Sequence, residues 1–250
     1  MINIKTSDEI EKMRSANQIV ARILMSLKGL IKEGATTIEL DAAADEMVKS
    51  EGAVPSFKGY RGFPKSLCTS INSEVVHGIP CDRKLKNGDI ISLDMGAELE
   101  GYYGDAAVTI AVGNGSDEAM RLIRVTREAL YKGIEHMREG NHLSDISSAI
   151  QSHAESGGFS VVKDYVGHGI GTKPHEDPPV PNYGPRGQGP VLKTGMVLAI
   201  EPMINAGSHR VKVLEDKWTV VTRDGRLSAH FEHSVAITKN GPDVLSELAA

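Results

Sequence analysis

Two aspartates, Asp94 and Asp105, stand on either side of a predicted turn at 98–101, which has glycine in its last position. The centre of this turn lies midway between them, so a regular antiparallel hairpin would place them opposite each other on one face. Their Cβ atoms would then be about 5 Å apart. Facing carboxylates repel each other unless a cation lies between them. The pair indicates either a cation site or two solvated aspartates separated by a bulge.

Three further residues are candidate ligands in the second half of the chain. His168 lies among three glycines at the end of a predicted strand, Glu201 ends a nearly continuous apolar run, and Glu232 lies within a strand-like run. A buried carboxylate needs a metal ion or a cationic side chain as its partner. When each residue is considered alone, an alternative remains. His168 could be a structural histidine, and Glu201 or Glu232 could form a Glu–Lys ion pair at a sheet edge.

The five residues together make a set of four carboxylates and one imidazole, each at or near a predicted strand. Such a set suits divalent ions such as Mn, Fe, Co or Zn. Two ions about 3.5–4 Å apart could share bridging carboxylates and convert a bound water into a hydroxide nucleophile. Since the sequence contains no HExxH motif and no CxxC pair, the common single-zinc arrangements do not apply.

Four amphipathic helices are expected to position these residues. Two begin at capping boxes that start with Thr6 and Thr36. Apolar residues at helical spacing extend the first over about 20 residues, and the second is expected to stop at Gly52. Two more helices are predicted at 117–138 and 143–156.

The remaining chain is rich in short β segments, predicted at 90–94, 106–112, 159–165, 196–201, 218–222 and 228–238. A stretch rich in Pro and Gly, 174–190, is predicted to be a long loop that serves a site. The order of helices, strands, helices and strands indicates two αβ halves, roughly 1–113 and 114–250. Because no flexible linker separates the halves, we expect an α+β fold with a single catalytic domain of residues 1–250.

The composition is that of an ordinary globular protein, with 250 residues, 40% hydrophobic and 24% charged. The net charge of −5 gives no reason to expect a nucleic acid as the main partner. The N-terminus lacks the apolar core of a signal peptide, and no stretch approaches the roughly 18 apolar residues of a membrane span. Two cysteines, Cys68 and Cys81, do not make a disulfide framework. A cytoplasmic location is expected.

The candidate ligands stand in motifs that resemble type I methionine aminopeptidases of the creatinase/aminopeptidase family. The resemblance extends from the first predicted helix to about Leu245. It rests on Asp94, Asp105 and the segments SINSEVVHGIP (70–80), GHGIG (167–171), AIEP (199–202) and HFEH (230–233). It implies the pita-bread fold, in which two pseudo-symmetric αβ halves share a curved antiparallel sheet covered by helices.

The resemblance assigns a role to each motif residue. It implies that two divalent metal ions are bound by Asp94, Asp105, His168, Glu201 and Glu232. Asp105 and Glu232 would bridge both ions, and Glu201 would also shuttle the proton of the attacking water. His175 would stabilise the tetrahedral intermediate, while His77 would contact the substrate near the scissile amide.

A pocket for the methionine side chain is also implied, lined by Tyr60, Phe63, Cys68 and Trp218. Aromatic and sulfur atoms suit a flexible thioether, although ordinary core packing is the alternative for these four residues. Cys68 is not expected to be a nucleophile, because a thiol needs an activating base that the metal set does not leave free. Pro174 departs from many relatives, which carry a bulky apolar residue before the histidine that corresponds to His175.

The expected substrates are methionyl peptides and the N-termini of nascent polypeptides, with a small residue after methionine. The resemblance further implies a monomer and a monovalent cation near Asn72 and Ser228. Since the sequence has no zinc-finger-like N-terminal extension, any transient ribosome contact is expected to be made by the catalytic domain. No membrane or specific nucleic acid is expected as a partner. Two alternatives remain: an Xaa-Pro peptidase of the same fold, whose members usually carry a long extra N-terminal domain, and a non-enzymatic binding relative that has lost its metals.

Overall fold

The first two helices begin at the predicted capping boxes. Helix α1 (Ser7–Lys28) follows Thr6, whose hydroxyl accepts the Glu9 N–H while the Glu9 carboxylate accepts the Thr6 N–H. Helix α2 (Thr37–Ser50) repeats the arrangement after Thr36. These reciprocal bonds satisfy backbone donors that a helix leaves unpaired at its start. Both predicted helix starts are therefore confirmed.

The second pair of helices is α3 (Asp117–Ile134) and α4 (Leu143–Ser156). Helix α4 has the predicted bounds. The predicted extension of α3 to residue 138 is wrong, because the chain tightens after Ile134: the N–H groups of His136 and Met137 donate to carbonyls three residues back. Such tighter turns are frequent at helix ends.

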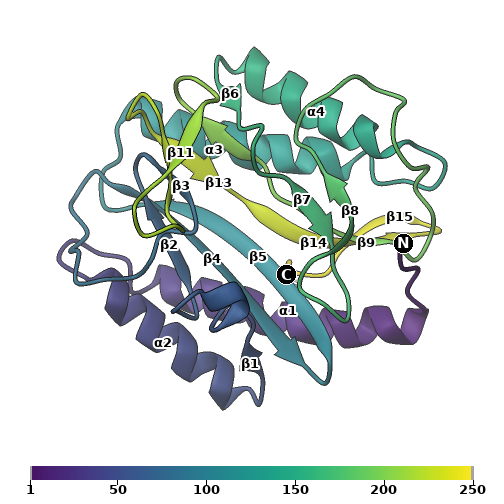
Figure 1. The fold of residues 1–250 in the computed structure, drawn as a ribbon, viewed down its shortest axis with the longest axis horizontal. Coiled ribbons are helices and arrows are strands. Elements are labelled where there is room, and N and C mark those ends of the chain that lie inside the picture. The colour runs from purple at the N-terminus through teal and green to yellow at the C-terminus, as the bar shows by residue number, and fades with distance from the viewer. Residues whose placement is uncertain (1, 249–250) are drawn as a thin grey trace.

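The computed structural model describes residues 2–248, and within them the central element is an antiparallel sheet of nine strands. Its main order is β1 (Val54–Pro55), β4 (Ile90–Leu99), β5 (Tyr102–Ala111), β14 (Glu232–Thr238), β9 (Val197–Ile200), β7 (Gly167–Gly169) and β8 (Glu176–Val180). In addition, β2 (Cys68–Ile71) pairs with β4, and β15 (Gly241–Val244) pairs with β14. The curled sheet and its helices confirm the predicted α+β class (Figure 1).

Two smaller sheets extend the structure at one end. One has the order β13 (Ser228–His230), β10 (Met203–Asn205) and β6 (Ser160–Val161). The other has the order β11 (Val211–Val213), β12 (Val220–Thr222) and β3 (Glu74–Val76). The predicted strand at 159–165 is therefore much shorter than expected, and the predicted strand at 228–238 is divided between two sheets.

The pair α1 and α2 packs against one half of the sheet, and the pair α3 and α4 packs against the other half (Figure 1). One hydrophobic cluster joins α1 and α2 to the first strands, through residues such as Leu24, Leu40 and Leu93. A second joins α3 and α4 to β9 and β14, through residues such as Leu130 and Leu198. The two predicted halves meet where β5 pairs with β14. Their description as halves of a single catalytic domain stays a prediction.

The predicted loop at 174–190 contains strand β8, which the sequence did not indicate. Its Pro178 and Pro179 lack the N–H that a central strand needs. However, β8 is the last strand of the sheet and pairs only with β7 along its main order, so prolines are tolerated there. The prediction failed because composition alone does not distinguish an edge strand from a loop.

Two neighbouring segments of the chain connect the main sheet to the smaller sheet that contains β10 and β13. After β9 the chain passes through Glu201 and Pro202 into β10, and after β13 it passes through Phe231 into β14. Met203 pairs with His230 on one side of these breaks, and Ile200 pairs with His233 on the other. Pro202 has no N–H to continue the β9 ladder. Glu201 and Glu232 are thereby placed together where the chain changes sheets.

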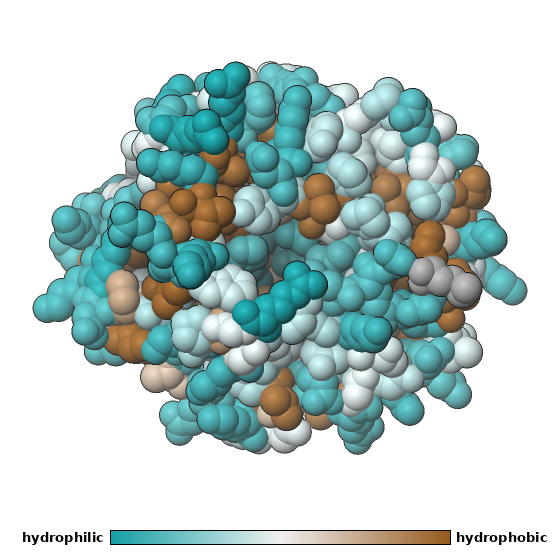
Figure 2. Space-filling view, in the orientation of Figure 1, coloured by the Kyte–Doolittle hydropathy of each residue, from teal (hydrophilic) through white to brown (hydrophobic). Residues whose placement is uncertain are grey.

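Among residues 2–248, the structure contains no helix that is both long and apolar enough to cross a membrane. The face seen in Figure 2 is largely hydrophilic around a central recess, with scattered apolar patches.

Candidate metal centre

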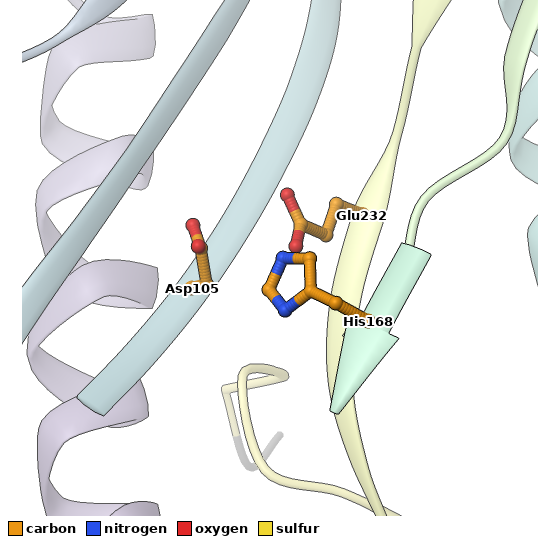
Figure 3. A group of neighbouring side chains, drawn as sticks. All are labelled: Asp105, His168 and Glu232. Carbon is orange, nitrogen blue, oxygen red and sulfur yellow. The ribbon is translucent and has the colours of Figure 1, made fainter. Parts of the chain in front are cut away.

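The five candidate ligands lie together in one pocket of about 150 Å³. They come from separate parts of the sheet: Asp94 from β4, Asp105 from β5, His168 from β7, Glu201 from the end of β9 and Glu232 from the start of β14. The side chains of Asp105, His168 and Glu232 converge from three strands (Figure 3). The structure thus brings together residues that lie up to 138 positions apart in the sequence (232 − 94).

The register of the β4–β5 hairpin differs from the predicted one. Asp94 pairs with Ala107, and Asp105 pairs with Gly96, so the two aspartates are diagonal neighbours on one face and do not lie directly opposite each other. The turn consists of Glu100 and Gly101, with φ values of 51° and 82°. Two positive φ angles define the tight turn that matches the strand twist, and this turn lies one residue later than the predicted turn.

Three of the carboxylates each have one buried oxygen without a protein partner. Asp94 Oδ1, Asp105 Oδ1 and Glu232 Oε1 are buried and accept no hydrogen bond. Ligand atoms of Asp105, His168 and Glu232 lie within 4.8 Å of one another. Buried carboxylate oxygens without a partner are destabilising unless a cation binds them. The donor set therefore fits divalent metal ions.

The electrostatics of the site show the same need for positive charge. Burial raises the pKa of Asp94 to about 7. Burial and then the neighbouring carboxylates raise the pKa values of Asp105, Glu201 and Glu232 well above their usual range. Each carboxylate resists ionisation next to the others, and a bound cation would reverse that preference.

His168 is oriented by its own backbone. Its Nδ1 lies 2.9 Å from the Gly169 carbonyl oxygen, which leaves Nε2 free to face Glu201 Oε1 at 3.4 Å. Burial lowers its pKa to about 3, so the imidazole is neutral, as a metal ligand must be. The flanking glycines permit this position: a Cβ at Gly167 would lie 2.4 Å from the Ala199 oxygen, and one at Gly169 would lie 2.2 Å from the Asp177 oxygen.

Two further histidines complete the polar part of the pocket. The ring of His175 lies 4.2 Å from that of His168 and stacks on Tyr60, with centroids 5.2 Å apart. His77 meets Trp218 edge to face at 6.3 Å. Burial, and then the charge of His175, lowers the pKa of His77 to about 4. Burial also lowers the pKa of His175. Both rings are therefore neutral near pH 7.

The apolar side of the pocket contains the four residues expected there, Tyr60, Phe63, Cys68 and Trp218. Phe63 and Trp218 pack edge to face with centroids 5.2 Å apart. Cys68 is buried and is the cross-strand partner of Asp94. Burial raises the pKa of its thiol well above the usual value, which argues against a nucleophilic thiolate.

Three residues near the site were not expected from the sequence. Phe57 and Arg61 line the pocket, and His230 Nε2 lies 3.7 Å from Glu201 Oε2. Phe57 and Arg61 belong to an irregular segment without hydrophobic periodicity, so no pattern pointed to them. His230 is two residues before Glu232, a spacing that places side chains on one face of a regular strand. The spacing of His230 and Glu232 was therefore the signal in the sequence that could have identified His230 as a residue near the site.

Comparisons with known proteins identify what the chain is similar to. Residues 11–239 match the model of "Metallopeptidase family M24". A methionine aminopeptidase of Clostridium perfringens is 56% identical over 246 residues, which cover 98% of this chain and 99% of the relative. The crystal structure of methionine aminopeptidase from Rickettsia prowazekii has a TM-score of 0.98 and 46% identity, over 99% of this chain and 100% of that one.

A more distant similarity bears on the alternative function. The prolidase from Pyrococcus furiosus has a TM-score of 0.77 and 25% identity. The match covers 99% of this chain but 66% of the prolidase. The sequence identity and the covered share of the relative are both lower than for the methionine aminopeptidases.

Proposed function

The chain belongs to the type I methionine aminopeptidases of metallopeptidase family M24, and on that basis we propose that it removes the N-terminal methionine from polypeptides by metal-dependent hydrolysis of the first peptide bond. Its structure has the pita-bread fold expected from the sequence. The observation that carries the proposal is the convergence of four carboxylates and His168 on one pocket, with buried oxygens that no protein group satisfies.

We propose that the site holds two divalent ions, Mn, Fe, Co or Zn. Their ligands would be Asp94, Asp105, His168, Glu201 and Glu232, and Asp105 and Glu232 would bridge. Four carboxylates supply enough negative charge for two ions, which a single ion would not neutralise. When bound, such a pair polarises a water molecule and the scissile carbonyl.

The chain's own groups would handle protons and charge. Glu201 lies beside His168 with a side chain that is 13% exposed, and it would take the proton of the attacking water, then return it to the leaving amine. His175, neutral and held by Tyr60, would donate a hydrogen bond to the oxyanion. His77, fixed against Trp218, would contact the substrate near the scissile amide.

Methionine would occupy the aromatic side of the pocket, between Tyr60, Phe63, Cys68 and Trp218. The pocket volume of about 150 Å³ is well below the volumes of sites that bind larger ligands, so the pocket suits a single flexible side chain. A small residue after methionine is proposed from the family resemblance alone.

Several finer features are proposed with this function. The substrates are nascent polypeptides and methionyl peptides, and the enzyme is a cytoplasmic monomer that makes a transient contact with the ribosome. A monovalent cation is proposed near Asn72 and Ser228, which are adjacent because the Ser228 N–H donates to the Asn72 carbonyl at 2.8 Å.

The test is release of free methionine from a Met-Ala-Ser peptide before chelation, after chelation, and after Mn or Co is added back. We expect activity to disappear and return, while an Xaa-Pro dipeptide is not cleaved. Cleavage of only the Xaa-Pro substrate would favour the alternative peptidase. Folded protein that binds metal but cleaves neither peptide would contradict the proposal.

A further inference from the structure

His230 is a buried histidine whose ring has no hydrogen-bond partner. The residue is 1% exposed, and neither Nδ1 nor Nε2 is bonded. It does not line the pocket that Glu201 and Glu232 line, although its Nε2 lies 3.7 Å from Glu201 Oε2. Buried imidazole nitrogens without partners are rare in folded proteins and need an explanation. Nothing in the hydrolytic scheme above uses this ring.

The backbone of His230 is held rigidly. Its N–H donates to Thr109 Oγ1 at 2.9 Å, and the same hydroxyl donates to the His230 carbonyl at 2.7 Å. The hydroxyl hydrogen of Thr109 takes part in the bond to the His230 carbonyl. Ser92 Oγ is therefore the donor in its 2.8 Å bond to Thr109 Oγ1. Across the sheet, His230 pairs with Met203, two residues after Glu201. These contacts fix the backbone from which the ring faces the Glu201 carboxylate.

The two oxygens of Glu201 face two different imidazoles. Oε1 lies 3.4 Å from His168 Nε2, and Oε2 lies 3.7 Å from His230 Nε2. The second separation is longer than a formed hydrogen bond, but polar contacts in enzyme sites often tighten when the site is loaded. We propose that His230 is a positioning residue: its Nε2–H donates to Glu201 Oε2 and directs Oε1 toward His168 and the metal ions. This inference rests on the proposed function.

A direct metal-ligand role for His230 is the competing interpretation, because ligand atoms of Glu201, His230 and Glu232 lie within 4.8 Å of one another. Positioning is favoured because His230 does not line the pocket and faces Glu201 Oε2, whereas His168, which lines the pocket, faces Oε1. Groups that hydrogen-bond a metal ligand from behind fix its orientation, and their loss typically weakens metal affinity or activity about 10–100-fold.

The test compares substitutions that keep or remove the donor. His230→Gln places an amide N–H near Glu201, whereas His230→Leu and His230→Met supply no donor. Met203→Leu is the control for a packing change at the cross-strand neighbour. Mn²⁺ affinity of the full chain is measured by titration calorimetry, together with kcat and KM for Met-Ala-Ser.

We expect the two donor-free variants to lose about 10–100-fold in Mn²⁺ affinity and in kcat, with little change in KM. His230→Gln and Met203→Leu should stay close to the unsubstituted protein. Equal Mn²⁺ affinity in all variants would overturn the proposal, and so would a His230→Gln variant as impaired as His230→Leu. If both donor-free variants fail to fold while His230→Gln folds and binds normally, the requirement for a donor is supported.

Proton NMR of the Co²⁺-loaded protein separates the two interpretations. Positioning predicts one exchangeable imidazole N–H resonance with a large paramagnetic shift, from His168. A second such resonance that disappears in His230→Gln would show a direct ligand and overturn the proposal. Failure of the proposed function would be seen differently: the unsubstituted protein would release no methionine from Met-Ala-Ser. The Mn²⁺ affinities of the variants, measured by calorimetry, would still test whether His230 positions Glu201.

Discussion

Gly96 is the cross-strand partner of Asp105 in the β4–β5 hairpin. A Cβ at Gly96 would lie 2.2 Å from Ser56 Oγ and 3.2 Å from Phe57 Cε1. The missing side chain therefore lets the segment of Ser56 and Phe57 approach the sheet next to Asp105, a proposed metal ligand. Because Phe57 lines the pocket, this glycine shapes one wall of the site.

Substitution of Gly96 should disturb both the fold and the pocket. We expect Gly96→Ala to lower the free energy of unfolding by about 1–3 kcal/mol, as overpacking does, and to raise KM through displacement of Phe57. Urea unfolding and steady-state kinetics on Met-Ala-Ser measure the two effects. Adding Ser56→Gly should restore part of the stability, because it removes the nearest atom. A fully stable Gly96→Ala protein would contradict the close approach.

Loss of a bridging carboxylate should abolish turnover. We expect Asp105→Asn to lower kcat for Met-Ala-Ser by orders of magnitude while circular dichroism stays unchanged, since the buried amide keeps the shape but not the charge. Asp82→Asn changes an exposed aspartate and serves as the control. Near-normal turnover of Asp105→Asn at saturating metal would refute the bridging role.

Removal of the indole should weaken substrate binding. We expect Trp218→Ala to raise KM for methionyl peptides roughly 10-fold or more, because the Phe63–Trp218 edge-to-face pair would no longer pack against the methionine side chain. Leu214→Ala, at a half-exposed position nearby, should leave KM unchanged. Identical kinetics for both variants would indicate that Trp218 contributes only to core packing.

The pKa of Asp94 predicts a pH dependence of stability. Burial raises it from 3.8 to about 7 in the folded state, so its contribution to stability is full below pH 3.8 and is lost as pH rises through 7. In chelator, we expect Asp94→Asn to gain stability relative to the unsubstituted protein between pH 4 and pH 8, by up to roughly 4 kcal/mol. The low pKa of His168 acts in the opposite direction but is common to both proteins.

Thermal unfolding across this pH range, with chelator and with Mn²⁺, measures the effect. Mn²⁺ should reverse the order at pH 8, because the unsubstituted protein gains a metal ligand that the amide lacks. A stability difference that does not change with pH would show that Asp94 ionises normally.

The sequence predicted the helices and the ligands better than the details of the sheet. Capping boxes at Thr6 and Thr36 are local signals, so two helix starts could be read directly. The hairpin register could not, because Gly101 fits either of two turns, and only the positive φ of Glu100 in the folded chain decides between them. Strand β8 was missed because its edge position is a property of the whole sheet.

For the site, residue chemistry and family resemblance selected eleven residues, and all of them line the same pocket. Their roles in binding and catalysis stay predictions. Phe57 and Arg61 were not found because an irregular segment carries no periodic signal, and its path depends on Gly96 and the sheet beneath it. His230 was overlooked because a histidine in a strand-like run reads as a packing residue until its distance to Glu201 is known.

Strand β14 comes near the end of the described chain, yet it lies in the middle of the main sheet, between β5 and β9. It also carries Glu232, so the proposed metal site would be complete only after this segment has been synthesised and inserted between two strands that were made earlier. A chain that stops before β14 would expose the edges of β5 and β9 to unwanted pairing. On the proposed assignment of Glu232, a copy that stops before β14 would lack a metal ligand as well as a central strand, and we expect it to be inactive and prone to aggregate.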